Sequence, residues 1–271
     1  MGLVSTTGAG TLRFVQAGRR TVVHTAKARS PLKLLLPNNH GTGSWVYVAT
    51  LGGGLVDGDV VSLSVDVERG ASALLGTQAS TKVYRSPTGT AQTLRAQVGP
   101  EALLAVLPDP VSCFAGARYE QSIDVRLDDG ATLLLVDALT CGRAARGERW
   151  AFSRYASRTR VWRGDRLVVL DATLLDPRHG DVAKRMGRFD AVATVLAIGP
   201  RAGEIRARVL AAATEPPQSH ASRLGSATAL GPDAVLGRLA ASSAHEAIAA
   251  VRALVAPIAA QLGDDPFARR W

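Results

Sequence analysis

The sequence predicts a mainly β protein, built as a stack of antiparallel and mixed strands with a few helices packed near the C-terminus. Three observations predict this class. Apolar and polar residues alternate along several segments, glycine-led turns recur along the first two thirds, and helical spacing begins in the last third. A period of two is typical of half-buried strands, and apolar residues three and four positions apart are typical of helices.

The clearest strand signal lies in residues 61–68. Apolar and polar residues alternate there without interruption, and the apolar set is Val61, Leu63, Val65 and Val67. Residues 12–17 alternate in a similar way, and residues 191–198 form an apolar run. We therefore expect a strand at each of these places, with one buried face in the first two.

A weak internal repeat joins a polar strand to an apolar strand through a glycine. Its copies begin at Gly70, Gly99, Gly130 and, more loosely, Gly164, at intervals of 29, 31 and 34 residues. Glycine accepts positive φ at low cost, so each copy marks a tight turn. Repeated strand–turn–strand units predict stacked hairpins or coils with a continuous core, as in solenoids. A plain antiparallel sandwich with evenly spaced turns is the alternative.

The C-terminal third combines helices with short strands. Residues 203–213 have the spacing of a short helix, and Pro216 and Pro217 end it because proline cannot continue a helix. Residues 224–230 and 235–241 have the pattern of short strands.

The last predicted helix has a start and a stop signal. Ser243 followed three residues later by Glu246 forms a capping box. An apolar stripe at helical spacing follows, made of Ala247, Ile248, Val251, Leu254, Val255 and Ile258. Pro257 kinks or ends this helix, Gly263 closes it, and residues 264–271 form a frayed tail.

The chain of 271 residues is long enough for one large domain or two small ones. Hydrophobic residues make up 46% of it, which suffices for a substantial core. No clear linker divides it, so we expect one domain over residues 1–271. Within it, residues 10–200 are β-rich, residues 201–262 mix strands and helices, and residues 263–271 form the tail.

Cysteine usage and the chain start indicate a cytoplasmic, soluble protein. Cys113 and Cys141 form no CxxC pair and no zinc-type spacing, so we expect two buried thiols in a reducing compartment. The first ten residues lack the basic start and apolar core of a signal peptide. The longest apolar stretches are far shorter than the roughly 20 residues that span a bilayer, so no membrane association is expected.

The formal net charge of +9 lies almost entirely in the second half of the chain. Residues 1–140 hold 12 Lys/Arg and 11 Asp/Glu, and residues 141–271 hold 20 and 12. The densest basic run comprises Arg143, Arg146, Arg149, Arg154, Arg158, Arg160, Arg163 and Arg166. Such a field favours acidic partners, and a solvated arginine-rich surface is the alternative interpretation.

Several kinds of catalytic or binding site are not supported by the sequence. The glycines of residues 52–58 do not form a phosphate loop, since no GK[ST] follows and the next element is a strand. No GxSxG elbow is present, and Cys113 has no evident histidine partner. The five histidines stand singly, without HxH or HExxH, so no high-affinity histidine metal site is expected.

Two kinds of candidate site residue remain. Lys82 and Arg85 lie in the most polar segment and could hold a carboxylate or a phosphate. Asp59, Asp137 and Glu148 are candidate carboxylates, and Asp137 lies inside an apolar run, where an unpaired charge is costly. Arg143 is a plausible partner for Glu148.

Four ordered motifs over roughly residues 10–200 resemble those of the UreD/UreH family of urease accessory proteins. Residues 52–59 (GGGLVDGD) resemble its GGG[LI]VxGD signature, and residues 76–86 (GTQASTKVYRS) resemble its TTQAATKVYRS segment. Residues 107–117 resemble LPQ…F.GA, and residues 142–148 resemble GR.A.GE. Gly76, Ser80 and the Asp109-Pro110 pair depart from the family pattern.

The resemblance implies a β-helix-like fold and a non-enzymatic role in urease maturation. Its partners would be a UreF-like accessory protein, a UreG-like GTPase that hydrolyses GTP, and apo-urease, with the UreF-like partner joining two such heteromers. No cofactor would be tightly bound, and nickel in transit would follow an internal polar tunnel. The positions carried over as partner or structural motif are Gly52, Gly53, Gly54, Gly58, Gln78, Thr81, Lys82, Tyr84, Arg85 and Arg143.

The resemblance further implies that Asp59, Asp137 and Glu148 line the nickel path. A metal in transit must leave again, and a few oxygen ligands suit that need better than a histidine cluster. Two other functions stay open from the residues alone. One is a basic β-rich nucleic-acid-binding protein, although the 13 aromatic residues are few and do not interleave with the arginine run. The other is a glycosidase with Asp137 and Glu148 as an acid pair.

Overall fold

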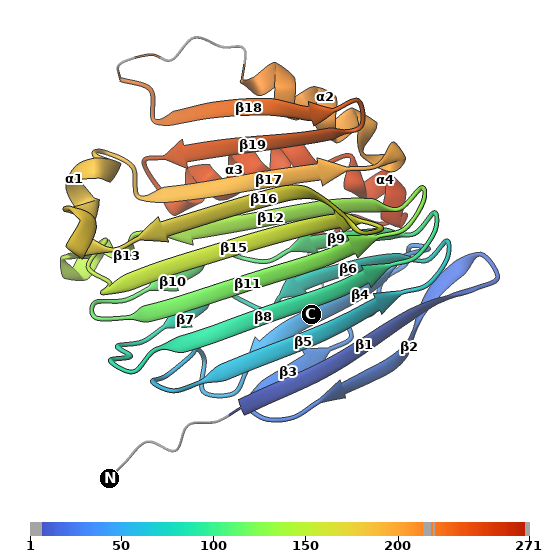
Figure 1. The fold of residues 1–271 in the computed structure, drawn as a ribbon, viewed down its shortest axis with the longest axis horizontal. Helices are drawn as coiled ribbons and strands as arrows, with labels where there is room; N and C mark the ends of the chain where they lie inside the picture. Colours follow the sequence, from blue (N-terminus) through green and yellow to red (C-terminus); the bar gives the residue numbers. More distant parts are fainter. Residues whose placement is uncertain (1–6, 214–217, 219, 269–271) are drawn as a thin grey trace.

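The computed structural model describes residues 7–213, 218 and 220–268, and most of these lie in strands (Figure 1). Two large sheets face each other, and helices near the C-terminus cover the outer face of one of them. The predicted mainly β class, with mixed sheets and C-terminal helices, is confirmed.

The first sheet has seven strands, of which the five central ones run parallel and the two edge strands run antiparallel to their neighbours. In spatial order they are β16 (Arg166–Leu175), β15 (Arg154–Arg163), β11 (Arg118–Leu127), β8 (Thr90–Val98), β5 (Val60–Val67), β1 (Thr7–Ala17) and β2 (Arg20–Ala28). The predicted strands at residues 12–17 and 61–68 are therefore β1 and β5.

The second sheet has ten strands. Its main path is β18 (Arg223–Gly231), β19 (Ala234–Ala241), β17 (Ala191–Ile198), β12 (Thr132–Thr140), β9 (Leu103–Leu107), β6 (Ser72–Thr77), β4 (Ser44–Thr50) and β3 (Leu32–Leu35). The short strands β10 (Val111–Cys113) and β7 (Thr81–Val83) pair beside β12. A separate two-stranded sheet consists of β13 (Gly142–Arg143) and β14 (Glu148–Arg149).

The repeat explains how the two sheets are built. The units β5–β6, β8–β9 and β11–β12 each give one strand to each sheet, and successive units pair in parallel. This parallel pairing excludes a plain antiparallel sandwich. The fourth copy, at Gly164, differs because its two strands, β15 and β16, form a hairpin within one sheet.

The turn glycines serve two different purposes. Gly70 and Gly130 have φ of 69° and 70°, which the glycine turns predict. Gly99 has no positive φ; a Cβ on it would lie 3.0 Å from the carbonyl oxygen of Val67, so the position requires close approach of two backbones. In that turn Glu101 takes the left-handed conformation instead, with φ of 60°.

Two apolar clusters account for the different strand patterns. One cluster fills the space between the sheets, and the other lies between the ten-stranded sheet and the helices. The central strands of the ten-stranded sheet are thus buried on both faces, so β6, β9 and β12 are almost continuously apolar. Strand β5 has one solvent-exposed face, so its sequence alternates. Cys113 and Cys141 are free and buried between the sheets, and burial raises the pKa of their thiols to about 12 and about 11.

The three strands and the first helix predicted for the C-terminal part are confirmed. Strands β17, β18 and β19 and helix α2 (Gly203–Ala212) coincide with the predicted segments. Pro216 and Pro217 lie outside the described residues. The remaining helices are α1 (Val182–Met186), α3 (Ala244–Val255), α4 (Ile258–Leu262) and the single-turn 3₁₀ helices η1 (Ala144–Arg146), η2 (Pro177–His179) and η3 (Pro200–Ala202). None of the helices in the described part of the chain combines the length and apolar character that crossing a membrane requires.

Helix α3 begins at the predicted cap. The Glu246 N–H donates to Ser243 Oγ at 3.2 Å, but the Glu246 carboxylate accepts from Ser242 Oγ at 2.6 Å, so only half of a capping box forms. Pro257 separates α3 from α4, and Gly263 ends α4 with φ of 76°. Phe267, in the segment predicted as a frayed tail, packs against the helix-side cluster.

Candidate functional site

A cavity of about 240 Å³ lies between the two sheets. Strand residues from both sheets line it, among them Val61, Leu63, Gln92, Leu94, Gln121, Ile123, Val48, Thr50, Leu75, Thr77, Val106 and Asp137. Six of the residues predicted from sequence are in its lining: Gly53, Gly54, Gln78, Thr81, Lys82 and Asp137. The cavity therefore brings the polar segment after β6 together with the carboxylate from the apolar run.

The other predicted residues lie elsewhere. Those outside the cavity lining are Gly52, Gly58, Asp59, Tyr84, Arg85, Arg143 and Glu148. Asp137 and Glu148 thus do not share a site, and the structure gives no support to an acid pair of the glycosidase type.

Asp137 faces the interior because of its place on β12. Leu133 and Leu135 pack between the sheets, while Leu134 and Val136 face the helices. Strand alternation puts Asp137 on the same side as the first two leucines. The carboxylate borders the cavity, but protein packed around it removes much of its hydration.

The pKa of Asp137 is raised, first of all by burial. Hydrogen bonds from Ser157 and Gln121 act in the opposite direction, and the charge of Asp171 adds to the rise. Ser157 Oγ donates to Asp137 Oδ2 at 2.8 Å. Within the described residues no lysine, arginine or histidine forms a salt bridge with this carboxylate.

A chain of polar side chains leads from Asp137 across the first sheet. Gln121 Nε2 donates to Ser157 Oγ at 3.2 Å. The Tyr119 hydroxyl lies 2.6 Å from Gln92 Oε1 and 3.0 Å from Gln121 Oε1. Burial, with the charge of Asp137 second, raises the pKa of Tyr119 well above its usual range, so the phenol stays protonated as a donor.

The sequence analysis does not predict this series of polar side chains, although the strand pattern contains a signal for it. Gln121 pairs in register with Gln92 on one side and with Ser157 on the other, and all three occupy inward positions of their strands. Polar residues at the core-facing positions of alternating strands point to an internal polar site.

The mouth of the cavity is held by contacts around the polar segment. The Asp109 N–H donates to Thr77 Oγ1 at 2.8 Å, and Thr77 Oγ1 donates to Asp109 Oδ2 at 3.1 Å. The Gln78 N–H donates to the Val48 carbonyl at 3.1 Å. Gly76, which departs from the family pattern, leaves room for Tyr47, because a Cβ on it would lie 2.9 Å from the tyrosine ring.

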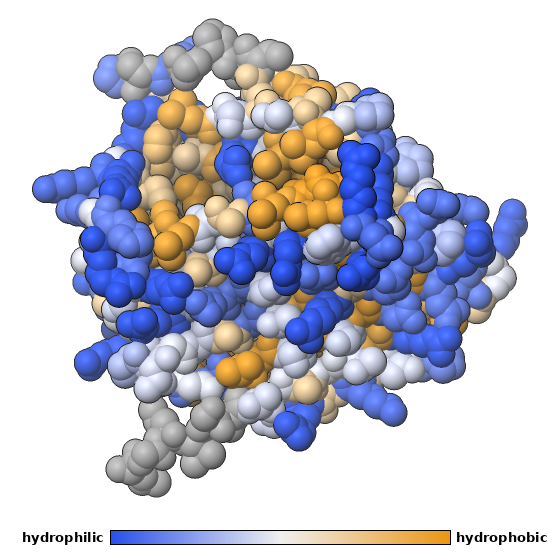
Figure 2. Space-filling model, in the orientation of Figure 1, coloured by the Kyte–Doolittle hydropathy of each residue, from blue (hydrophilic) through white to orange (hydrophobic). Residues whose placement is uncertain are grey.

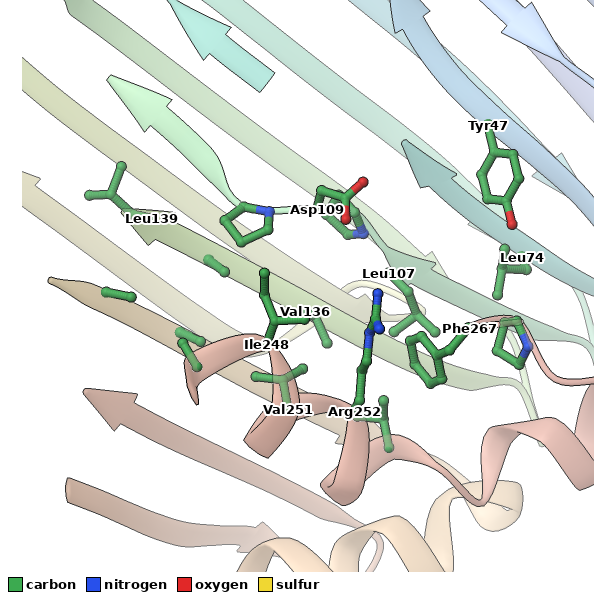
Figure 3. A pocket seen from close by; sticks show the side chains of 18 residues that line it. Tyr47, Leu74, Leu107, Asp109, Val136, Leu139, Ile248, Val251, Arg252 and Phe267 are labelled. Atoms are coloured by element: carbon green, nitrogen blue, oxygen red, sulfur yellow. The ribbon is translucent and has the colours of Figure 1, made fainter. Parts of the chain in front are cut away.

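A second, smaller cavity of about 50 Å³ lies between the ten-stranded sheet and helix α3. Its lining is mostly apolar, and Arg252 points from α3 toward the segment that carries Leu107 and Asp109 (Figure 3). The Arg252 guanidinium stands over the Phe267 ring at 5.3 Å. Asp109 lines both cavities, so it lies between the polar and the apolar one.

The glycine signature forms a structural clasp. Gly52 and Gly53 have φ of 89° and 73°, and a Cβ on Gly54 would lie 2.5 Å from the Lys82 carbonyl oxygen. This close approach lets the Leu55 N–H donate to the Lys82 carbonyl at 2.8 Å. The clasp thereby fixes the rim of the cavity.

The two aspartates of the signature stabilise two turns, Asp59 its own and Asp57 the turn at Thr88 and Gly89. The Val56 N–H donates to Asp59 Oδ2 at 2.9 Å, and Asp59 is buried. Asp57 Oδ1 accepts from the Thr88 hydroxyl and from the backbone N–H groups of Thr88 and Gly89. These bonds, led by the Thr88 hydroxyl, lower the pKa of Asp57.

Glu148 belongs to a cluster on another part of the surface. Arg143 donates to it through Nε at 2.9 Å and Nη2 at 2.5 Å, and the Ala115 N–H donates at 3.1 Å. These bonds, with Arg143 first, lower the pKa of Glu148. Arg143 also stands over the Phe114 ring at 4.2 Å, and Tyr84 meets that ring edge-on at 5.3 Å.

The part of the chain that the structure describes holds no cluster of three or more His, Cys, Asp or Glu side chains able to hold a metal ion. The cavity lining instead holds two single carboxylates, Asp137 and Asp109, beside amide and hydroxyl oxygens. Such a donor set suits a weakly held cation and not a tightly bound structural metal.

Ion pairs neutralise much of the basic run. Five of its eight arginines form salt bridges: Arg143 with Glu148, Arg149 with Asp190, Arg154 with Glu120, Arg160 with Asp124 and Arg163 with Asp233. The run is thus partly a structural network that ties strands of the first sheet to one another and to the second sheet.

Comparison with known proteins gives one consistent result. The family model for the UreD urease accessory protein matches residues 6–271. The urease accessory protein UreD of Sorangium cellulosum (strain So ce56) is 56% identical over 264 residues, covering 97% of this chain and 84% of the relative. That of Anaeromyxobacter sp. (strain Fw109-5) is 44% identical over 265 residues, covering 97% and 89%. The urease accessory protein D of Arabidopsis thaliana is 39% identical over 202 residues, covering 72% and 69%.

Proposed function

Since this chain belongs to the UreD family of urease accessory proteins, we propose that it is a non-enzymatic scaffold that passes nickel to apo-urease. The observation that carries the proposal is the polar cavity between the sheets, with Asp137 beside it. The family relation itself supports a role in urease maturation, and the cavity suggests how the chain takes part.

The donor set of the cavity suits a cargo ion. A nickel ion in transit needs ligands that hold it briefly, and the Asp137 carboxylate with a neutral oxygen from Gln121 holds a cation less tightly than a cluster of charged ligands. Burial also favours cation binding, because a carboxylate that has lost hydration, as Asp137 has, is stabilised more strongly by an arriving cation.

Among the three candidate carboxylates, we assign the path to Asp137. Asp59 accepts a hydrogen bond within its own turn, and Glu148 is paired with Arg143. Both therefore enter the proposal as residues that stabilise the scaffold outside the cavity rim. Gln78, Thr81 and Lys82 complete that rim.

The proposed partners are a UreF-like accessory protein, a UreG-like GTPase and apo-urease. GTP hydrolysis is assigned to the GTPase, and the UreF-like protein joins two of these heteromers. The chain works in the cytoplasm, holds no resident cofactor and carries nickel only in transit.

A co-expression experiment tests this function. The tagged chain is produced with the urease structural and accessory proteins of the same organism, and complex formation and nickel-dependent urease activity are measured for wild type, Asp137→Asn and Asp129→Asn. Asp129 is an exposed turn residue and serves as the matched control. We expect both variants to assemble, and only Asp137→Asn to lose activation, by about tenfold or more.

Two results would contradict the proposal. Equal urease maturation without the chain would remove its role altogether. A complex that forms and activates normally with Asp137→Asn would remove the cavity from the nickel path. Salt-sensitive binding of a duplex DNA oligonucleotide would instead favour the basic surface as a nucleic-acid site.

A further inference from the structure

The seven-stranded sheet ends at β16, a ten-residue edge strand with an apolar outer face. Among the described strands, β16 pairs with β15 alone, so its other edge presents a row of backbone donors and acceptors without a strand partner. Leu167, Leu170 and Leu174 on this strand are 38%, 61% and 49% exposed. Natural proteins usually protect so long an edge with charges, or cover it.

The facing sheet continues beyond this edge. Asp171 of β16 pairs with Arg238 of β19, and β18 lies farther out (Figure 1). Leu236 of β19 faces the first sheet, and by register Leu224 of β18 shares that face; both stay partly exposed, and Leu230 is 40% exposed. Figure 2 shows hydrophobic side chains gathered over this region and bordered by hydrophilic ones. A strand placed next to β16 would cover them.

The surroundings of β16 are basic. The hairpins at residues 154–175 and 223–241 hold seven arginines and three aspartates. On β15, Arg160 and Arg158 stand directly beside Leu170 and Ala172. Arg160 is paired with Asp124, but within the described residues Arg158 forms no ion pair. An apolar strip beside uncompensated positive charge favours an occupant with both apolar and acidic side chains.

We propose that β16 is a docking edge, to which a partner protein adds an extended segment that carries apolar and acidic side chains. Backbone hydrogen bonds to the free edge supply affinity, and the leucines and arginines supply selectivity. Inward side chains of the added strand pack over Leu236 and Leu224, and outward ones lie beside Leu170 and Arg158. This inference rests on the proposed function, because the partner is one of the urease-maturation proteins.

Two other occupants fit the surface less well. A second copy of this chain would bring its own arginine-rich edge against the first, and like charges would oppose the contact. Nucleic acid would be attracted by the arginines, but it would leave the leucines and the backbone edge uncovered. A protein segment can pair with the backbone edge, cover the leucines and place acidic side chains beside the arginines.

Hydrogen exchange on the assembled complex tests the proposal. Amide exchange is compared between the free chain and its complex with the co-expressed urease proteins. We expect slower exchange along β16 in the complex, whereas β2, the opposite edge of the same sheet, keeps its rate. Protection of backbone amides distinguishes strand addition from contacts made by side chains alone.

Matched variants test the side chains. In Leu170→Glu the new carboxylate lies within the proposed contact, and we expect a fall in partner affinity of about tenfold or more. Leu36→Glu changes a leucine of similar exposure, 52% against 61%, at a distant place, and Val22→Glu changes the opposite edge. Both controls should bind like wild type. Circular dichroism checks that each variant is folded.

The outcomes separate the two proposals. Slower exchange along β16, with loss of binding only in Leu170→Glu, supports the docking edge. A complex that forms while β16 exchange and Leu170→Glu binding stay unchanged overturns the docking edge and leaves the proposed function intact. Failure of wild type to form any complex overturns both. Concentration-dependent dimerisation of the free chain that is abolished by Leu170→Glu would assign the edge to a second copy and overturn the proposal.

Discussion

Asp137 lies beside the cavity between the two large sheets, whereas Glu148 lies in the small two-stranded sheet, paired with Arg143. The protein shifts the pKa values of the two carboxyl groups in opposite directions. Burial raises the pKa of Asp137, and the Arg143 guanidinium lowers the pKa of Glu148. The Glu148 carboxylate is already ion-paired with Arg143. Within the described residues Asp137 forms no ion pair with a cationic side chain, and this leaves its carboxylate available to the cation of the proposed function.

One short segment connects these two regions. Lys82 contributes to the cavity rim, and Tyr84, two residues later, packs on Phe114 in the Glu148 cluster. Gly54 contacts both, since a Cβ on it would lie 2.5 Å from the Lys82 carbonyl oxygen and 2.8 Å from the Tyr84 ring. Gly54 therefore helps to fix both the cavity rim and the Glu148 cluster.

The largest expected effect is that of Gly54→Ala. The added methyl group meets a backbone oxygen that cannot move without breaking the Leu55–Lys82 hydrogen bond, so we expect a loss of about 2–3 kcal/mol in the free energy of unfolding. Urea denaturation measures it. Gly53→Ala is the control: its surroundings are open and only its positive φ is strained, at a cost of about 1 kcal/mol. Equal stability of the two variants would contradict the crowding argument.

Much of the fold is predictable because it depends on local patterns. The alternation of β5 and the turn at Gly70 are local, and so are the cap at Ser243 and the break at Pro257. The hairpin at Gly164 is not predictable from its motif, because whether the second strand crosses to the other sheet or turns back depends on which edge is free. The left-handed conformation expected of Gly99 occurs at Glu101 instead. Gly99 is required for a different reason, its close packing against the Val67 backbone.

The candidate site was predictable only in part. The sequence identifies Asp137 because it interrupts an apolar run, and it identifies residues 77–86 by their polarity. Which of these residues share one cavity depends on the register of separate strands, and sequence spacing does not contain that register. Gln92, Gln121 and Ser157 are not predictable for the same reason, since each is ordinary in its own strand and only their pairing makes a series of polar contacts.

An intermediate effect is expected for Asp137→Asn on the pH dependence of stability. The folded chain holds the Asp137 proton more tightly than the unfolded chain does, so this group favours folding below its ordinary pKa of about 3.9. That contribution is lost as pH rises through the higher folded pKa. We therefore expect the variant to gain stability relative to wild type at neutral pH, with the gain shrinking as the pH is lowered.

Urea denaturation of both proteins at several pH values measures this difference. Asp129→Asn, at an exposed turn, controls for the loss of one negative charge. A difference between wild type and Asp137→Asn that does not change with pH would contradict a raised pKa at Asp137.

The smallest effect, of opposite sign, is expected for Glu148→Gln. Arg143 lowers the pKa of Glu148, so its contribution to folding is present above the ordinary pKa of about 4.3 and is lost as pH falls through the lower folded pKa. The variant should be slightly less stable than wild type at neutral pH, and the two should converge in acid. The group is close to solvent, which screens the pair and keeps the effect small. If the two variants shifted stability with the same sign at neutral pH, the contrast between a paired and an unpaired carboxylate would not hold, because Glu148 would then gain nothing from Arg143.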